Sequence, residues 1–237
     1  QAGPVTPAVL ETTSRERQVA RLVTRFVERA HYSRLTVDDS LSDATLKTYL
    51  ETLDGNRHYF LQSDIAYFAR YKTTLDDSLR RGDMEPVFDI FRLYRLRAPQ
   101  NIGYAMSLLD QEPDFALDED YVFAREKLPW AATPAEMQDL WRKRVKNDAL
   151  SLMLADKTWK ETGDILRKRY QRVLDRVNEL DSDDVFETFM NSFARTLDPY
   201  PEVAPSDLHR PQRDLVANLE RVEPVPAARD DILIARA

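Results

Sequence analysis

Residues 13–30, TSRERQVARLVTRFVERA, carry the clearest amphipathic pattern in the chain. Thr13 precedes Glu16 by three positions, which is the spacing of a capping box at the start of a helix. Apolar side chains then recur at helical spacing, at Val19, Leu22, Val23, Phe26, Val27 and Ala30. The stretch therefore predicts an amphipathic helix.

The same periodicity recurs along the chain and predicts an all-α fold. Further helices are expected at about 42–53, from Ser63 to the glycine at 82, from Asp83 to Pro99, near 100–111, from Pro134 onward, at 159–180, and from Ser182 to Leu197. Pro99 is expected to break or kink its helix. Glycine occurs only five times among 237 residues, which disfavours β folds with many tight turns. Residues 13–198 thus predict an irregular multi-helix bundle of about eight helices.

Three stretches depart from the helical pattern. Residues 1–12 contain glycine and proline and predict a flexible arm. Residues 112–133 predict a long ordered loop with one short strand. Six of the thirteen prolines follow Asp198, so residues 199–237 predict a proline-rich tail with one or two short helices. A helix at about 211–222 is expected to pack on the bundle or on a neighbouring subunit, after an extended excursion or a chain break between 199 and 210.

Composition excludes several classes of function. The chain has no cysteine, so disulfides, thiolate zinc sites and cysteine nucleophiles are ruled out. No apolar run approaches the roughly 18 residues of a membrane span. The net charge of −7 disfavours non-specific binding of nucleic acid. Composition alone fits both the cytosol and the periplasm.

Residues that could carry catalysis are few. The three histidines lie far apart in the sequence and outside any His-Glu-x-x-His pattern, at His31, His58 and His209. No serine has a lysine three residues later, and there is no Gly-x-Ser-x-Gly motif. We therefore predict no catalytic, cofactor-binding or metal-ligating residue and no cofactor, and interpret each histidine as structural.

Clusters of charge also favour structural interpretations. The acidic residues 181–184 lack the glycine and distal glutamate of an EF-hand loop and precede a helix, so helix capping is the preferred interpretation over a cation site. The basic residues 142–146 and 167–170 could contact phosphate, but are interpreted as solvated helix faces that pair with carboxylates.

Aromatic residues are dense between positions 59 and 94. Most occupy positions expected to face the core, and the alternative is a groove for a partner helix or an extended peptide. The set comprises Tyr59, Phe60, Tyr67, Phe68, Tyr71, Phe88, Phe91 and Tyr94.

An ordered series of segments runs through residues 15–199. It comprises Arg25-Phe26-Val27, His31-Tyr32, Leu53-Asp54, Phe60-Leu61-Gln62-Ser63-Asp64, Phe68, Leu75-Asp76-Asp77-Ser78-Leu79-Arg80, Gly82, Pro129-Trp130, Leu140-Trp141-Arg142-Lys143-Arg144-Val145-Lys146-Asn147-Asp148, Arg169-Tyr170, Asp184-Val185-Phe186 and Phe193-Ala194-Arg195-Thr196-Leu197-Asp198-Pro199. In this order the segments resemble the N-terminal helical domain of the tail-specific, or carboxy-terminal processing, proteases of Gram-negative bacteria.

The resemblance implies a set of family properties. Full-length members are periplasmic serine endopeptidases with a Ser/Lys catalytic pair, and a PDZ domain recognises unstructured apolar C-termini of protein substrates. The N-terminal helical domain is non-catalytic: it helps to form the bowl around the protease core and offers surface to adaptor proteins or to partner subunits, including a homo-oligomer.

The chain departs from the family pattern after residue 199. The family continues into its PDZ and catalytic parts, whereas here Tyr200-Pro201-Glu202 follows, and neither the PDZ loop nor the catalytic pair is recognised. Residues 199–237 could be a C-terminal helical piece of the same protease after a missing segment. Two functions stay open: the non-catalytic helical part of such a protease, and a stand-alone helical adaptor. In both, this chain alone is expected not to cleave peptides.

Overall fold

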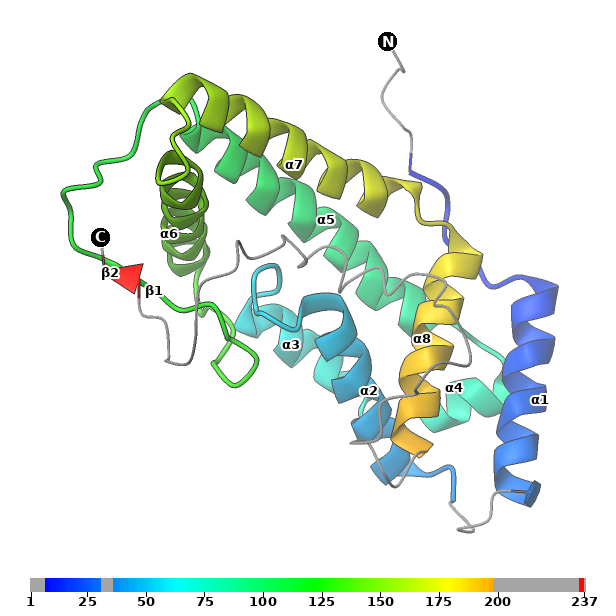
Figure 1. Ribbon diagram of the computed structural model, residues 1–237. Helices are drawn as coiled ribbons and strands as arrows, with labels where there is room; N and C mark the ends of the chain where they lie inside the picture. The colour runs from blue at the N-terminus through cyan, green and yellow to red at the C-terminus, as the bar shows by residue number, and fades with distance from the viewer. Residues whose placement is uncertain (1–6, 31–35, 198–234, 237) are drawn as a thin grey trace.

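The computed structural model describes residues 7–30, 36–197 and 235–236 (Figure 1). Within these ranges the fold is all-α, as the sequence predicts. The helices are α1 (Ser14–Ala30), α2 (Asp39–Asp54), α3 (Gln62–Phe68), α4 (Leu75–Arg81), α5 (Glu85–Leu108), α6 (Pro134–Met153), α7 (Trp159–Glu179) and α8 (Ser182–Leu197), with the 3-10 helix η1 at Ala69–Tyr71. The expected helix at 211–222 and the excursion at 199–210 lie outside the described residues.

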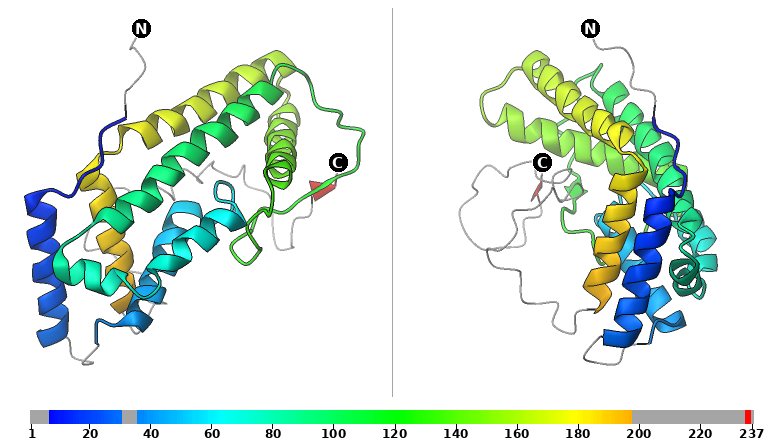
Figure 2. Two further views of the ribbon diagram at one scale, coloured as in Figure 1. Left: turned by 180° about the vertical axis from the view of Figure 1, so that it is seen from behind. Right: turned by 90° about the vertical axis from the view of Figure 1, so that its right-hand side faces the viewer.

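The long helix α5 connects the two ends of the fold. At one end α6 and α7 pack against it, and at the other it meets α8 (Figure 1). Helix α2 packs against α8 and α4, and α4 in turn packs against α1. The view in Figure 2 that shows the right-hand side of the molecule places α1 and α8 side by side with their N-termini at the same end.

Aromatic side chains fill the core, which confirms the core interpretation of the sequence for most of the 59–94 set. Six of its eight members are buried, whereas Tyr67 is 39% exposed and Tyr71 is half-buried. The ring of Phe60 meets that of Phe68 edge-on at 5.2 Å, and Tyr49 of α2 meets Phe189 of α8 at 5.3 Å. Edge-to-face pairs of this kind add to the stabilisation from burial.

The helix predicted from Ser63 to residue 81 is divided in the structure. Helix α3 ends at Phe68, η1 follows, and α4 starts at Leu75. Thr73 and Thr74 lie at the break, and β-branched residues are poor helix formers. The turn brings α4 against α1 and α2 instead of letting it continue α3.

The break predicted at Pro99 does not occur. Helix α5 continues through Pro99 to Leu108 as one element. Buried side chains lie on both sides of the proline, including Tyr94 and Ile102, and α6 and α7 pack against this part of the helix. Tertiary packing therefore outweighs the loss of one backbone hydrogen bond.

Helix α3 starts one residue earlier than predicted, whereas α8 starts at Ser182 as predicted. Helix α3 begins at Gln62 rather than at Ser63, because the carboxylate of Asp64 accepts the N–H of Leu61 at 2.9 Å. At α8 the cap is formed by residues 181 and 184: each side chain accepts the other's backbone N–H, at 3.0 and 3.1 Å. This arrangement confirms capping by the acidic segment, with Asp181 as the cap.

The described part of the N-terminal arm is docked rather than flexible. Leu10 is 3% exposed, and Arg92 Nη2 donates to its carbonyl at 3.0 Å. Arg95 Nη1 donates to the carbonyl of Ala8 at 2.7 Å. The buried Leu10 side chain and the two arginine bonds, to the carbonyls of residues 8 and 10, hold this part of the arm against α5.

The long loop 112–133 contains the expected short strand. Strand β1 (Asp120–Tyr121) pairs antiparallel with β2 (Ala235–Arg236), with Asp120 opposite Arg236. Of the tail predicted to hold one or two short helices, the described residues 235 and 236 are thus extended.

Candidate functional site

A buried carboxylate organises the turn between α2 and α3. Asp54 is 2% exposed and accepts the backbone N–H groups of His58, Tyr59 and Phe60 at 2.7–3.2 Å, together with Trp130 Nε1 at 3.0 Å. Burial raises the pKa of Asp54 to about 7, while the four N–H donors favour its charged form. The group holds a turn in place, and each of these bonds comes from another part of the protein.

Arg57 closes the same turn in a left-handed conformation, with φ at 60°. Its guanidinium donates to the carbonyls of Asp54 at 3.0 Å and Glu126 at 2.8 Å, and stacks over the Trp130 ring at 3.8 Å. The α2–α3 turn is therefore fastened to the long loop 112–133, which lies far away in sequence.

His58, the one histidine within the described residues, lies in the interior of the fold. It is 4% exposed, and burial together with Arg144 and Arg125 holds its pKa well below its ordinary value. Arg144 Nη1 lies 2.8 Å from Nδ1, and Tyr121 Oη lies 3.1 Å from Nε2. Because arginine only donates, Nδ1 accepts and the proton sits on Nε2. His31 and His209 lie outside the described residues.

The basic segment 142–146 is only partly solvated, which corrects the sequence interpretation. Arg144 points inward to stack on the Trp141 ring at 4.8 Å, and Lys146 is 6% exposed. Lys146 Nζ donates to Glu119 at 2.9 Å, and Arg142 forms a two-pronged ion pair with the same carboxylate. The bond from Arg142 and then that from Lys146 lower the pKa of Glu119 to about 2. The predicted pairing with carboxylates is confirmed.

The second basic segment, 167–170, divides in the same way. Arg167 pairs with Asp110 at 2.8 Å, and Lys168 is exposed. Tyr170 is buried and donates to Asp148 at 2.8 Å. The cations of the first segment are therefore engaged with protein groups, and in the second segment Arg167 is paired in the same way.

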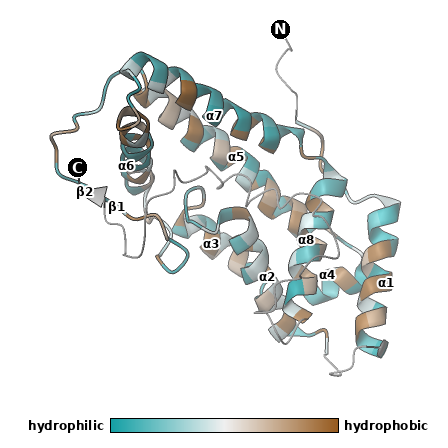
Figure 3. Cartoon of the chain, viewed as in Figure 1, coloured by the Kyte–Doolittle hydropathy of each residue, from teal (hydrophilic) through white to brown (hydrophobic). Residues whose placement is uncertain are grey.

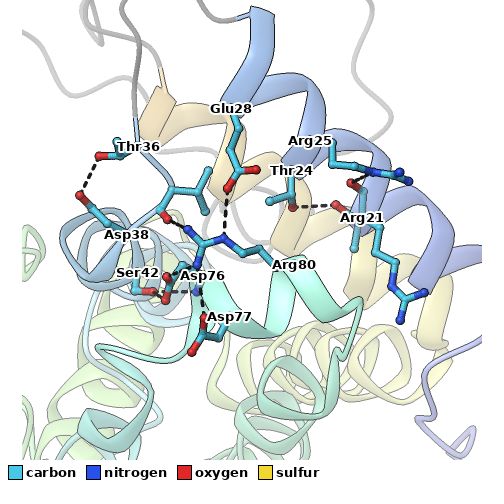
Figure 4. Close-up of polar contacts among 12 residues, drawn as sticks. Arg21, Thr24, Arg25, Glu28, Thr36, Asp38, Ser42, Asp76, Asp77 and Arg80 are labelled. Atoms are coloured by element: carbon cyan, nitrogen blue, oxygen red, sulfur yellow. Dashed lines mark hydrogen bonds and ion pairs between the residues drawn. The ribbon is translucent and has the colours of Figure 1, made fainter.

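Arg80 fastens α4 to its neighbours (Figure 4). Its guanidinium donates to Glu28 of α1 at 3.0 Å, to Asp76 at 2.8 Å, and to the carbonyl of Val37 before α2. Asp76 also accepts the hydroxyl of Ser42 at 2.8 Å. Burial opposes the charge of Arg80, but its carboxylate partners outweigh that effect and its pKa is raised.

A hollow lies between α1 and α8. Its volume is about 380 Å³. Four apolar and five polar or charged side chains line it: Val19, Val23, Phe186 and Met190, and Arg15, Glu16, Asp183, Glu187 and Asn191. Arg15 and Asp183 bridge the two helices at 3.2 Å. We call this feature the α1–α8 hollow; sequence patterning could not find it, because it needs two helices remote in sequence.

A second cavity of about 440 Å³ lies where α5 meets the long loop. Arg142 and Lys146 reach its wall but are already paired with Glu119. In the part of the chain that the structure describes, no three histidine, aspartate or glutamate side chains gather in a way that could hold a metal ion. Nor does any helix there have the length and apolar content needed to cross a bilayer.

Comparison with known proteins places this arrangement in a family. A family profile described as the tail-specific protease N-terminal domain matches residues 23–201. A tail-specific protease of Haemophilus influenzae is 38% identical over 190 residues, which cover 79% of this chain and 27% of that relative. The matched region thus spans about a quarter of the relative's length. Both matches extend over most of the helical bundle, and the chain belongs to the tail-specific protease N-terminal domain family.

Proposed function

We propose that this chain is the helical, non-catalytic part of a periplasmic carboxy-terminal processing serine endopeptidase. The observation that carries the proposal is the 38% identity over 190 residues with a tail-specific protease. The Ser/Lys pair and the PDZ domain would belong to other parts of the parent chain, which would act on proteins with unstructured apolar C-termini. Residues 13–198 would form the N-terminal helical domain, and 199–237 a separate tail.

The role of the domain in this proposal is scaffolding, with surface for an adaptor protein or another subunit. Support comes from what the family segments do in the structure. Asp54, Asp64 and Arg80 hold turns and helix junctions together. Trp130 and Arg144 act in the same way, since each contacts the α2–α3 turn. These residues stabilise the shape of the domain, which fits a scaffolding role better than a catalytic one.

The proposal is tested by measuring the size and the cellular location of the native protein. An antibody raised against the 237-residue chain should detect, in cells of the source organism, a polypeptide several hundred residues long that osmotic shock releases with the periplasm. A band at the mass of the chain itself, 27.6 kDa, would favour the alternative, a stand-alone helical adaptor.

A second measurement tests the assignment as non-catalytic. The purified chain, incubated with an unfolded protein that ends in apolar residues, should leave that protein intact on a gel. Cleavage that a serine-directed inhibitor abolishes would overturn the assignment.

A further inference from the structure

Four arginines form a row along the surface of α1. Arg17, Arg21, Arg25 and Arg29 follow one another at intervals of four residues, and all are exposed. Side chains at this spacing are neighbours on a helix, so the row extends over about 18 Å. Arg21 Nε donates to the carbonyl of Arg81 at the end of α4, at 2.7 Å, and Figure 4 shows Arg21 and Arg25 apart from the ion-paired side chains between α1 and α4. We call these four residues the arginine row.

The charges of the arginine row are not balanced within the described part of the chain. None of the four arginines forms an ion pair with a carboxylate there, and the exposed Glu28 of the same helix is paired with Arg80 at 3.0 Å. Like charges four residues apart destabilise a helix. Helix α1 therefore carries four charges that its described surroundings do not neutralise, which favours a surface that meets an anionic partner.

Two large apolar side chains are exposed beside the arginine row. Leu22 is 64% exposed and Phe26 is 66% exposed, and each directly follows an arginine of the row in the sequence. They are four positions apart, so their side chains adjoin. The hydropathy colouring of Figure 3 shows apolar positions among hydrophilic ones along α1. A helix that packs only within its own molecule is polar on its outer face, whereas basic and apolar side chains exposed together are typical of a helix at a membrane surface.

The acidic residues of α8 lie on the other side of α1. Asp183 and Glu187 are across the α1–α8 hollow, and Val23 belongs to the α1 wall of that hollow. Because a helix turns by about 100° a residue, positions 21 and 23 point in nearly opposite directions. Figure 1 places α1 at the edge of the molecule, with α8 on its inner side. The arginine row and the two apolar side chains can therefore meet a flat surface without the acidic edge of α8.

We propose that α1 binds the surface of a bilayer rich in anionic phospholipid. The helix lies along the membrane plane, the arginine row contacts lipid phosphate groups, and Leu22 and Phe26 enter the boundary between headgroups and acyl chains. Arginine suits this contact, because its guanidinium binds phosphate through two parallel hydrogen bonds and its long stem reaches along the helix surface to the headgroups. The inference goes beyond the proposed function, since lipid binding is a separate property from proteolysis.

A polyanion that is recognised by charge alone fits this surface less well. Nucleic acid could neutralise the arginines, but its phosphate backbone offers no apolar medium for Leu22 and Phe26. Helix α7 provides a comparison, because Lys168, Arg172 and Arg176 are exposed on it at the same spacing. Within α7, all of which the structure describes, no large apolar side chain is exposed. A polyanion would therefore bind both rows, whereas a bilayer would prefer α1.

Vesicle flotation with the 237-residue chain tests the proposal. The probe is a vesicle of phosphatidylcholine that contains an increasing share of phosphatidylglycerol. The fraction of protein that floats should rise with the share of phosphatidylglycerol and fall between about 0.05 M and about 0.5 M salt, because salt screens the contact. Vesicles of phosphatidylcholine alone should bind little protein, since they lack the anionic charge. A chain that floats with none of these vesicles overturns the proposal.

Removal of charge tests the arginine row. Arg21→Gln combined with Arg25→Gln should weaken vesicle binding at least about tenfold, because each arginine at an anionic surface contributes about fivefold. Arg172→Gln combined with Arg176→Gln is the matched control, since it removes the same charge at the same spacing from α7. The control should change binding by less than about twofold. Equal losses would mean that the vesicles respond to the total charge of the chain, which overturns the assignment to α1.

Removal of the apolar pair distinguishes a bilayer from another polyanion. Leu22→Ser combined with Phe26→Ser should weaken vesicle binding about tenfold at the same net charge, because no large apolar side chain then enters the lipid. Leu154→Ser is the control, since Leu154 is 77% exposed and lies at the end of α6. Circular dichroism should be the same for the variants and the parent chain. If the Leu22 and Phe26 substitutions leave binding unchanged, the row recognises charge alone and the proposal is wrong.

A chain that ends at Leu197 tests whether the tail covers the surface. Equal flotation of the shortened and the intact chain supports the proposal. If only the shortened chain floats, residues 198–237 occupy the arginine row in the intact protein, and the proposal is overturned. None of these results bears on whether the parent protein is a protease.

Discussion

Asp54 shows how one side chain can fix a connection that local propensity leaves open. Its carboxylate accepts three backbone N–H groups of the α2–α3 turn and the indole N–H of Trp130 in the long loop. Four buried donors meet at one group, and a buried donor without a partner is costly. The residue therefore ties together two segments that are separated by more than a helix in the sequence.

We predict that Asp54→Ala lowers the free energy of unfolding by about 3 kcal/mol or more, because it leaves these donors unsatisfied. Asp118→Ala is the control, since Asp118 is exposed in the loop and should change stability by less than about 0.5 kcal/mol. Urea unfolding followed by circular dichroism measures both. Equal effects of the two substitutions would show that the turn does not depend on Asp54.

The ion pairs of Glu119 predict that the free energy of unfolding depends on pH. Its pKa of about 2 in the fold lies below the ordinary value of 4.5, chiefly because Arg142 donates to it. Between these values the unfolded chain holds a proton that the folded protein does not. Unfolding takes up a proton, so the free energy of unfolding falls as the pH falls from about 4.5 to about 2. Glu119→Gln should remove this part of the pH dependence, seen as closer urea midpoints at pH 7 and pH 3. An unchanged difference between the midpoints would rule out the ion pairs as its source.

Two glycines differ in whether a larger side chain would fit at their positions. Gly82 ends α4 with φ at +67°, and a Cβ there would lie 2.5 Å from the carbonyl oxygen of Arg17 in α1. Gly103 lies inside α5, where a Cβ would meet nothing within 4 Å. The first glycine permits close contact between two helices, and the second only weakens its own helix.

Gly82→Ala should therefore lower the free energy of unfolding by about 2 kcal/mol or more, from backbone strain and from the contact with α1. Gly103→Ala should raise it by up to about 1 kcal/mol, because alanine favours helix. Thermal melts of the two variants beside the parent protein would show opposite shifts. A Gly82→Ala protein as stable as the parent would contradict the close approach of α4 to α1.

Pro99 leaves one carbonyl of α5 without its helical donor, yet the helix continues. Pro99→Ala should supply the missing N–H and raise the free energy of unfolding by about 1–3 kcal/mol. Leu96→Ala, at a 53% exposed position of the same helix, controls for the general effect of alanine. A destabilised Pro99→Ala protein would show that the packing of α6 and α7 needs the shape that proline gives to α5.

The whole molecule depends on α5, because this helix contacts elements at both ends of the fold. All three tryptophans lie between positions 130 and 159, near α6 and the start of α7. Their fluorescence therefore reports on one end, while far-ultraviolet circular dichroism reports on every helix. We predict that the fluorescence and the circular dichroism show the unfolding transition at the same urea concentration, because a continuous core couples the two ends of the fold. Separate transitions would mean that the α5–α6–α7 end unfolds as its own unit.

The fold also corrects the interpretation of the basic segment 142–146. Its sequence pattern predicts that Arg144 and Lys146 face solvent, because charged residues on an amphipathic helix are usually exposed. In the fold they turn toward His58 and Glu119, groups that come from the α2–α3 turn and the long loop. Helical periodicity cannot identify such partners, because they lie on other elements.

The sequence alone was enough to predict the all-α class, most of the helices, most of the core aromatic residues and the family. Helical periodicity and capping depend on neighbours three or four residues apart, so they can be read from the chain directly. The folded structure was needed to find the division of 63–81, the continuity of α5 across Pro99, and the roles of Asp54 and Arg144. The α1–α8 hollow belongs to the same group. Each depends on contacts between segments far apart in sequence, where packing and the burial of charge outweigh local preference.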